Sequence, residues 1–335
     1  MKKKLLALTL AALMAMSLAA CGGQSSTEPA QESKEPEAAE PAAQTFTIGI
    51  CQLVQHPALD AATQGVRDAV VEALGEENVT FVEQNASGDS ATCTTICGQF
   101  VTDGVDLILA NATPALQAAS AATGSIPILG TSVTEYGVAL GIDGFDGTVG
   151  TNVSGTSDLA PLDQQAAMVK ELFPDAKTVG LLYCSGEANS QYQVDTVKGY
   201  LEDLGYTCTL YSFVDSNDVT SVTKTACDAS DVLYIPTDNT AASNTEAINN
   251  VAKPAGVPVI TGEEGICAGC GVATLSISYY DLGVATGKMA VKVLTGESNI
   301  SEMPIEYAPQ FTKKYNADLA DALGVTIPEG YEAIA

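Results

Sequence analysis

Apolar and polar residues alternate in blocks from about Thr45 onward. The run TIGICQL at residues 47–53 has the apolar content of a buried strand, and residues 58–74 after it repeat apolar positions at helical spacing. The same unit recurs through the first half, which predicts further strands at 79–84, 106–111 and 126–133 and further helices at 90–102 and 114–123. Pro114 suits the first turn of the last of these helices, with Thr113 as its cap.

A second series of the same kind follows residues 151–158. It predicts strands at 179–184, 208–214, 232–236 and 257–261, and helices at 159–173, 189–204, 218–228 and 240–252. A last helix at 281–294 and a short tail remain. Strands that alternate with helices favour parallel sheets covered on both faces, so the fold class is α/β with two doubly wound, Rossmann-like lobes.

The first residues have the features of an export signal. Three lysines precede an apolar stretch that is too short to cross a bilayer, and Leu18-Ala19-Ala20-Cys21 ends it with small residues and a cysteine. This resembles a bacterial lipoprotein signal over residues 1–20, with Cys21 as the acylated residue. Residues 21–44 are rich in Ser, Glu, Pro, Ala and Gln, which predicts a flexible tether. We therefore expect an extracytoplasmic protein held to the cell membrane by lipidated Cys21.

The charge of the chain limits its partners. The formal net charge is −27, and loss of the signal would remove three more lysines, so nucleic acid and anionic lipid surfaces are unsuitable partners. Arg67 is the only arginine and falls in a predicted amphipathic helix. An anionic part of a ligand would therefore need helix N-termini and hydroxyl groups rather than an arginine clamp.

Polar residues gather just after the predicted strands. In parallel sheets of this kind ligands bind outside the carboxyl ends of the strands, and polar ends from both halves favour a cleft over simple helix caps. The candidates are Gln52, His56, Asn111, Thr113, Thr131, Ser132 and Thr134 in the first half and Glu187, Asn189, Asp238, Asn239, Glu263 and Glu264 in the second.

Several short runs resemble a known family in their order and spacing. They are HPALD (56–60), NATPA (111–115), NVSGTSD (152–158), SGEANS (185–190), PTDN (236–239), GEEG (262–265) and SISYYDLG (276–283). Together they are similar to substrate-binding lipoproteins of ABC transporters, over essentially all of the chain after Thr45. The NVSGTSD run adds Ser154 and Asp158 to the ligand-binding candidates.

The resemblance implies a type I periplasmic-binding-protein fold whose two lobes close on one small solute, an aromatic amino acid being favoured. It implies a monomer that works with an ABC permease and its ATPase. The lobes would comprise 46–157 with 277–302, and 158–276 with 303–335, joined by a three-strand hinge near Asp158, Ser276 and Met303.

The resemblance also implies roles for individual residues. Asn189, Asp238 and Glu264 would hold the ammonium group, although the choice between Glu263 and Glu264 stays open. Thr113, Thr131 and Ser132 with nearby backbone N–H groups would hold the carboxylate. The candidates to stack on an aromatic ring, for each of which ordinary packing is the commoner role, are Tyr136, Phe145, Tyr183, Tyr192, Tyr279 and Tyr280.

Enzymatic functions find little support, and we expect no cofactor or metal. The chain has one histidine and no nucleophile elbow, and GVATGK at 283–288 is one residue short of a P-loop. Eight cysteines remain besides Cys21. Cys93 and Cys97 share a helical face with apolar residues, which favours buried free thiols. Two alternatives remain: a lipid-anchored redox or metal protein built on Cys267-Ala268-Gly269-Cys270, and a ligand-sensing lobe of a signalling receptor.

Overall fold

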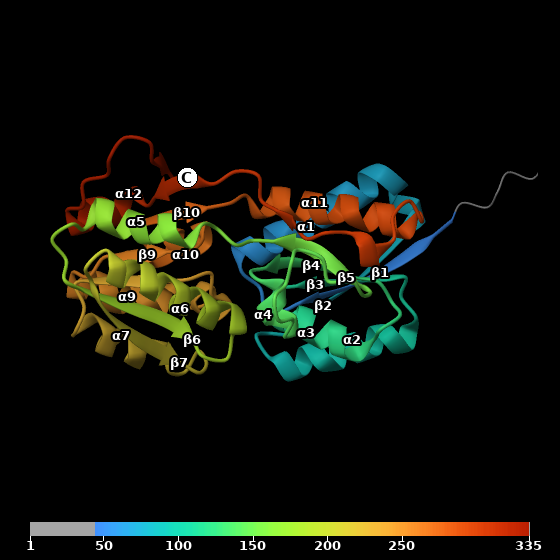
Figure 1. The fold of residues 1–335 in the computed structure, drawn as a ribbon, viewed down its shortest axis with the longest axis horizontal. Helices are drawn as coiled ribbons and strands as arrows, with labels where there is room; N and C mark the ends of the chain where they lie inside the picture. The colour runs from blue at the N-terminus through green and yellow to red at the C-terminus, as the bar shows by residue number, and fades with distance from the viewer. Residues whose placement is uncertain (1–43, 335) are drawn as a thin grey trace, which may run out of the picture. The chain divides into compact units, whose positions relative to one another are not determined.

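The structure is a computed structural model that describes residues 44–334. The predicted signal, Cys21 and nearly all of the predicted tether lie outside these residues. Within residues 44–334 the strands form two sheets, whose orders are β11-β5-β4-β3-β1-β2 and β13-β12-β10-β9-β8-β6-β7. All neighbouring strands are parallel except β10 and β12. The predicted α/β class with two doubly wound lobes is confirmed (Figure 1).

The first lobe is built around the sheet that β1 opens. Its strands are β1 (Phe46–Gln52), β2 (Val79–Asn85), β3 (Leu107–Asn111), β4 (Ile128–Val133), β5 (Val153–Ser157) and β11 (Glu306–Tyr307). Its helices are α1 (Pro57–Leu74), α2 (Ser90–Asp103), α3 (Thr113–Ala122), α4 (Tyr136–Leu140) and α11 (Tyr279–Leu294), with 3₁₀ turns at Glu76–Asn78 and Ile300–Glu302. In Figure 1 α1 and α11 cover one face of this sheet, and α2 and α3 cover the other.

The second lobe repeats this plan. Its strands are β6 (Thr178–Cys184), β7 (Thr207–Phe213), β8 (Val232–Ile235), β9 (Val259–Thr261), β10 (Ala273–Ser276), β12 (Thr312–Tyr315) and β13 (Glu332–Ala333). Its helices are α5 (Leu162–Leu172), α6 (Ala188–Asp203), α7 (Val219–Cys227), α8 (Asn239–Ala242), α9 (Thr245–Ala255), α10 (Glu264–Cys270) and α12 (Ala317–Leu323). Apolar clusters on both faces of each sheet explain the continuous apolar runs of the strands.

The chain passes between the sheets three times. It crosses after β5, between β10 and α11, and between β11 and β12. The third crossing comes later than the predicted position at Met303, because β11 pairs with β5 and the side chains of Met303 and Ile305 pack in the first lobe. Residues 303–307 therefore belong to the first sheet, a correction to the predicted assignment of 303–335.

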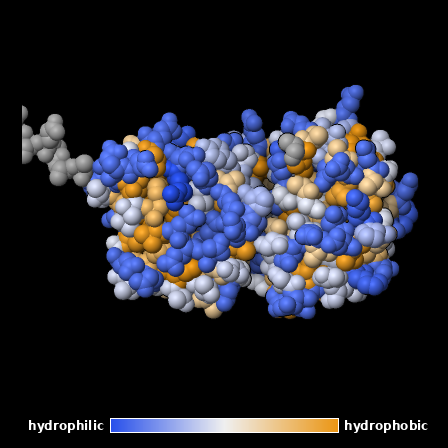
Figure 2. All heavy atoms as spheres, turned by 180° about the vertical axis from the view of Figure 1, so that it is seen from behind, coloured by the Kyte–Doolittle hydropathy of each residue, from blue (hydrophilic) through white to orange (hydrophobic). Residues whose placement is uncertain are grey.

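Some local elements differ from the expectation. The single helix predicted at 240–252 is two helices, α8 and α9, and the short elements α4, α10, β10, β12 and α12 had no periodic signal long enough to predict them. Helix α3 begins at Thr113, so its cap is Ala112 rather than Thr113. Hydrophilic residues cover much of the face shown in Figure 2, and patches of apolar residues lie between them on both lobes. No helix in residues 44–334 has the length and apolar content to cross a membrane.

Candidate ligand-binding site

A polar cavity lies where the two sheets face one another. Its free volume is about 10 Å³, far below the roughly 300–1,000 Å³ of small-molecule pockets, so side chains nearly fill the space between the lobes. Its lining residues are His56, Leu59, Ser132, Thr134, Asp158, Asn189, Thr237, Asp238, Asn239, Ala242, Glu263 and Tyr279. They come from both lobes and from two of the crossings between them, so the cavity exists only while the lobes are together.

The strand ends position these side chains. His56 lies between β1 and α1, Thr134 follows β4, Asp158 follows β5, and Glu263 follows β9. Parallel strands end at the same edge of a sheet, which brings residues distant in sequence to one place. The hydrogen bond between His56 Nε2 and Asn239 Oδ1, 3.2 Å long and buried, joins the two lobes directly.

Ser132 owes its position to an irregularity in the first sheet. The register between β4 and β5 shifts between Gly130 and Val133, and Ser132 has a φ of 54°, a left-handed conformation that is uncommon for a residue other than glycine. Bulges of this kind redirect side chains next to functional sites. The bulge brings a hydroxyl group to the cavity wall.

Four buried polar atoms of the lining residues have no hydrogen-bond partner. They are His56 Nδ1, Ser132 Oγ, Asp158 Oδ1 and Asn189 Oδ1. Leaving a buried polar atom unpaired costs roughly 1–3 kcal/mol, so four of them around one cavity are more than a folded protein normally leaves unpaired. This arrangement indicates a binding site whose polar partners come with the ligand.

Three buried carboxyl groups make the cavity acidic. Burial is the main cause that raises the pKa of Asp158 to about 6 and the pKa values of Asp238 and Glu263 to about 7. Asp238 accepts hydrogen bonds from the backbone N–H groups of Cys184 and Ala241, at 2.6 and 2.7 Å.

Glu263 is engaged in the same way as Asp238. Its two oxygens cap α10 by accepting from the N–H groups of Gly265 and Ile266. Asp158 alone of the three carboxyl groups keeps one oxygen, Oδ1, without a partner. An ammonium group in the cavity would therefore find its open carboxylate at Asp158.

No lysine or arginine lines the cavity. Arg67 pairs with Glu83 at 3.1 Å on the surface, as expected from its amphipathic helix. The N-terminus of α1, which contributes Leu59 to the wall, has no side-chain cap. Its free N–H groups and the positive end of its dipole are suited to a carboxylate, as the scarcity of arginine predicts.

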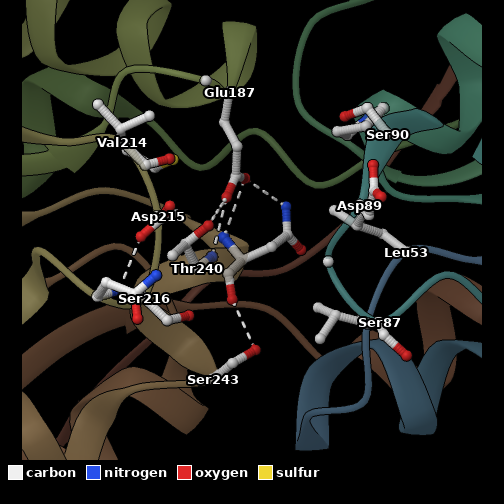
Figure 3. A pocket seen from close by; sticks show the side chains of 17 residues that line it. Leu53, Ser87, Asp89, Ser90, Glu187, Val214, Asp215, Ser216, Thr240 and Ser243 are labelled. Carbon is white, nitrogen blue, oxygen red and sulfur yellow. Dashed lines mark hydrogen bonds between the residues drawn. The ribbon is translucent and has the colours of Figure 1, made fainter. Parts of the chain in front are cut away.

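An outer groove of about 380 Å³ adjoins the cavity, and Asn239 lines both. Figure 3 shows Ser87, Asp89 and Ser90 of the first lobe on one side of the groove and Glu187 and Thr240 of the second on the other. The groove carries acidic groups on both sides and no basic one. It is a polar surface between the lobes that stays open while the inner cavity is closed.

The structure brings part of the predicted site together. The candidates that line the inner cavity are His56, Ser132, Asp158, Asn189, Asp238, Asn239 and Glu263, together with Thr134 and the stacking candidate Tyr279. The lining residues that sequence reasoning missed are Leu59, Thr237 and Ala242. Thr237 lies just after β8, so it could have been found from the expectation that ligand-binding residues follow the strands. Leu59 and Ala242 are apolar helix residues, and nothing in the sequence distinguishes them from core residues.

Other candidates do not line the inner cavity. Gln52 and Asn111 fix α1 to the sheet, since Gln52 accepts from Thr63 Oγ1 at 2.7 Å and Asn111 donates to Leu59 O at 2.8 Å. Ser154 donates to Met303 O at 3.0 Å.

Thr113 and Thr131 are buried but do not line the cavity, and Glu187 lines the outer groove. Glu264 pairs with Lys314 at 2.6 Å outside the cavity, whereas Glu263 lines the cavity.

The cysteine motif does not have the surroundings of a redox site. Cys267 and Cys270 are buried in the last turn of α10 and not at the N-terminus of a helix, and burial raises the pKa of both thiols. A low thiol pKa needs a helix N-terminus or a nearby cation. Cys93 and Cys97 pack in the apolar core of the first lobe, as their spacing predicts, and no group of three or more His, Cys, Asp or Glu in residues 44–334 is placed to hold a metal ion.

Comparisons with known proteins agree with this architecture. Residues 47–335 match the family described as ABC transporter substrate binding protein. A tyrosine-binding protein of Clostridioides difficile (strain R20291) is 34% identical over 324 residues, which cover 96% of this chain and 92% of that protein. An ABC domain from Streptococcus pneumoniae in complex with L-Trp is 32% identical with a TM-score of 0.83, covering 87% of this chain and 100% of the other.

The arrangement of the lobes resembles that complex. A ligand-free, open structure of a substrate-binding protein with adhesive properties from Clostridium difficile is 38% identical, covers 87% of this chain and 99% of the other, and has a TM-score of only 0.66. The Trp complex is thus nearer in shape although it is less similar in sequence. Proteins of this kind bind small solutes outside the cytoplasm and work with a permease and an ATPase. The chain belongs to the family of ABC transporter substrate-binding proteins, and it is the substrate-binding component of such a transporter.

Proposed function

We propose that the solute is an aromatic amino acid, which the two lobes enclose in the inner cavity and present to the permease. Of the relatives that are more than 30% identical to this chain, one is named for tyrosine and one is a complex with L-Trp, and they cover 96% and 87% of this chain. We also propose that the protein acts as a monomer held to the membrane through lipidated Cys21. A Cys21→Ser variant should then appear in the culture medium rather than with the membrane, with the rest of the protein intact.

The amino group binds at Asp158. Its Oδ1 is the one carboxylate oxygen of the cavity that has no partner, and Tyr279 Oη already holds Oδ2 at 3.0 Å. Asn189 Oδ1 is a second unpartnered acceptor in the same wall. An ammonium group brings three N–H donors, so it can pair with both acceptors and keep Asp158 ionised.

The carboxylate binds at the first lobe. Ser132 Oγ is unpartnered, Thr134 lines the cavity beside it, and the uncapped N-terminus of α1 supplies N–H groups. These groups neutralise a carboxylate by hydrogen bonds and a helix dipole. Amino and carboxyl groups at these positions leave the side chain of the solute to face Leu59 and Ala242.

In this proposal the three crossings between the lobes act as the hinge about which the lobes close. A ligand that contacts both lobes favours the closed arrangement, because only that arrangement completes the contacts. Asp158 and Tyr279 stand at two of the crossings. The ammonium group thus binds close to the axis about which the lobes close.

The unpartnered Oδ1 of Asp158 carries this proposal and suggests the test. Asp158→Asn keeps the shape and removes the charge, so the dissociation constant for tryptophan or tyrosine, measured by calorimetry on the fragment from residue 44 onward, should rise roughly tenfold to a hundredfold. Asp163→Asn, on the exposed first turn of α5, is the matched control and should change nothing. Equal affinity in the two variants contradicts this role of Asp158, and no binding of any aromatic amino acid by the wild type contradicts the proposed function.

A further inference from the structure

We propose that His56 decides between aromatic solutes: its Nδ1 accepts a hydrogen bond from a ring N–H or O–H, so the site takes tryptophan or tyrosine and discriminates against phenylalanine. This inference rests on the proposed function, because it assigns a role in ligand choice to His56, which lines the same cavity. It adds a requirement on the chemistry of the solute, namely a donor on its ring.

The orientation of the Asn239 amide is the first step. Asn239 Nδ2 donates to Glu187 Oε2 at 2.6 Å. Glu187 acts as an acceptor, because its oxygens also receive the backbone N–H groups of Asn239 at 3.1 Å and Thr240 at 2.9 Å. The amide nitrogen of Asn239 therefore faces Glu187, and Oδ1 faces His56.

The tautomer of His56 follows from this orientation. Nε2 lies 3.2 Å from Asn239 Oδ1, which can only accept, so Nε2 carries the proton. Burial lowers the pKa of His56, which keeps the ring neutral near pH 7. A neutral imidazole with a proton on Nε2 has a bare acceptor at Nδ1.

This acceptor has no donor within the protein. His56 is the N-cap residue of α1, yet its side chain makes no capping bond, and Nδ1 is buried without a partner while the residue is 7% exposed. The cavity that His56 lines is where a donor can be supplied. A solute that brings a donor removes the cost of the unpaired atom, and one without it does not.

The ring rather than the amino group supplies this donor. The ammonium group is drawn to the charged acceptor at Asp158, which stands at a crossing between the lobes, whereas His56 is neutral. His56 and Asn239 lie toward the outer groove, since Asn239 lines both spaces. Leu59, one turn into the helix that His56 caps, gives this part of the wall an apolar surface for a ring.

Affinities for three solutes test the proposal. Wild-type protein should bind tryptophan or tyrosine at least tenfold more tightly than phenylalanine, because phenylalanine leaves Nδ1 unpaired. His56→Leu, whose folding a cooperative thermal melt checks, also loses the bond to Asn239 and should bind all three solutes more weakly, but it should lose this preference. His56→Asn offers an acceptor near the position of Nδ1 and should keep part of it. A wild-type ratio near one, or a preference that survives in His56→Leu, overturns the proposal while the proposed function stands.

Nitrogen NMR gives a readout that does not depend on variants. His56 is the only histidine of the chain, so its two ring nitrogens give the only imidazole signals. The wild-type spectrum should show a protonated Nε2 and a bare Nδ1, and saturating tyrosine or tryptophan should shift the Nδ1 signal toward that of a hydrogen-bonded nitrogen, whereas phenylalanine should not. A proton on Nδ1, or the same shift with all three solutes, contradicts the proposal. A wild type that binds none of the three contradicts the proposed function instead.

Discussion

Tyr279 donates a hydrogen bond from its phenol oxygen to Asp158 Oδ2 at 3.0 Å, and the two residues stand on different crossings between the lobes. Both side chains are buried. The bond therefore ties the open carboxylate of the cavity to two of the three segments about which the lobes move. A solute that engages the other oxygen of Asp158 acts directly on the hinge.

Removing this phenol should weaken binding. Tyr279→Phe leaves Asp158 Oδ2 without its donor, and because the hydrogen bond from Tyr279 favours the ionised form, its loss should raise the pKa of Asp158 further. We expect the affinity for the amino acid at pH 7 to fall roughly fivefold to fiftyfold by calorimetry. Tyr280→Phe is the control, since the Tyr280 hydroxyl bonds Asp68 on the exposed surface. Equal losses in the two variants would argue against a special role for Tyr279.

The affinity should depend on pH through Asp158. Its pKa is about 6 without ligand, and an ammonium group favours the charged form, so binding releases a proton below that pH. Affinity should rise from pH 5 to about pH 7 and level off above the pKa. Calorimetry in two buffers of different ionisation enthalpy measures the released proton. Asp158→Asn should reduce the pH dependence, and an equally steep profile in that variant would assign it to another group.

The stability of the ligand-free protein should fall as the pH rises, whereas the affinity for the ligand should rise. Asp158, Asp238 and Glu263 have folded-state pKa values raised by burial to about 6, 7 and 7, so the folded protein binds more protons than the unfolded chain between about pH 4 and pH 7. These groups contribute fully to the free energy of unfolding when the pH is below their pKa values in the unfolded chain. The contribution is lost as the pH rises through their pKa values in the folded protein, and each unit of pKa shift accounts for about 1.4 kcal/mol. Thermal melts should therefore show the melting temperature falling from pH 4.5 to 7.5. Glu263→Gln should flatten the curve, and a melting temperature that rises over this range would contradict the prediction.

The contact between α1 and α11 should tolerate no added methyl group. A Cβ at Gly283 would fall against the carbonyl oxygen of Ala62, and this close approach explains the GVATGK run better than a phosphate loop does. Gly283→Ala should lower the free energy of unfolding by about 1–3 kcal/mol in a denaturant titration. Gly199→Ala, with open space around its helical position, is the control and should be neutral or stabilising. A neutral Gly283→Ala would show that the two helices can separate without cost.

Native thiols should react slowly. The cysteines of residues 44–334 are all free, and each of them is buried except Cys208, which is partly exposed. Burial raises the pKa of the Cys208 thiol to about 11, so even this residue forms little thiolate near neutral pH. A thiol-specific reagent should label only Cys208 in the folded protein and the remaining cysteines after denaturation. Rapid labelling that persists in Cys208→Ser would reveal another accessible thiol.

Local patterns in the sequence predicted the fold class and part of the candidate site. The alternation of strand and helix signals depends on spacing within one segment, and it predicted two doubly wound lobes. The position after the predicted strands placed His56, Ser132 and Asp238 near the cavity, whereas Asp158 came from the family resemblance. The signal features at Cys21 are also local, and they remain a prediction about residues outside the described part of the chain. The resemblance to a family of ABC transporter proteins was confirmed because its motifs are spread over the whole fold.

Tertiary structure decided which polar residues face the cavity and which support it. Gln52 and Asn111 are the last residues of β1 and β3, and they bond to α1 instead of facing the cavity. Glu264 pairs with Lys314 from a strand fifty residues away, while its neighbour Glu263 lines the wall. Sequence spacing gives the element and the end of the strand on which a residue lies. The direction of a side chain depends on register, on bulges such as the one at Ser132, and on partners that only the folded chain brings together.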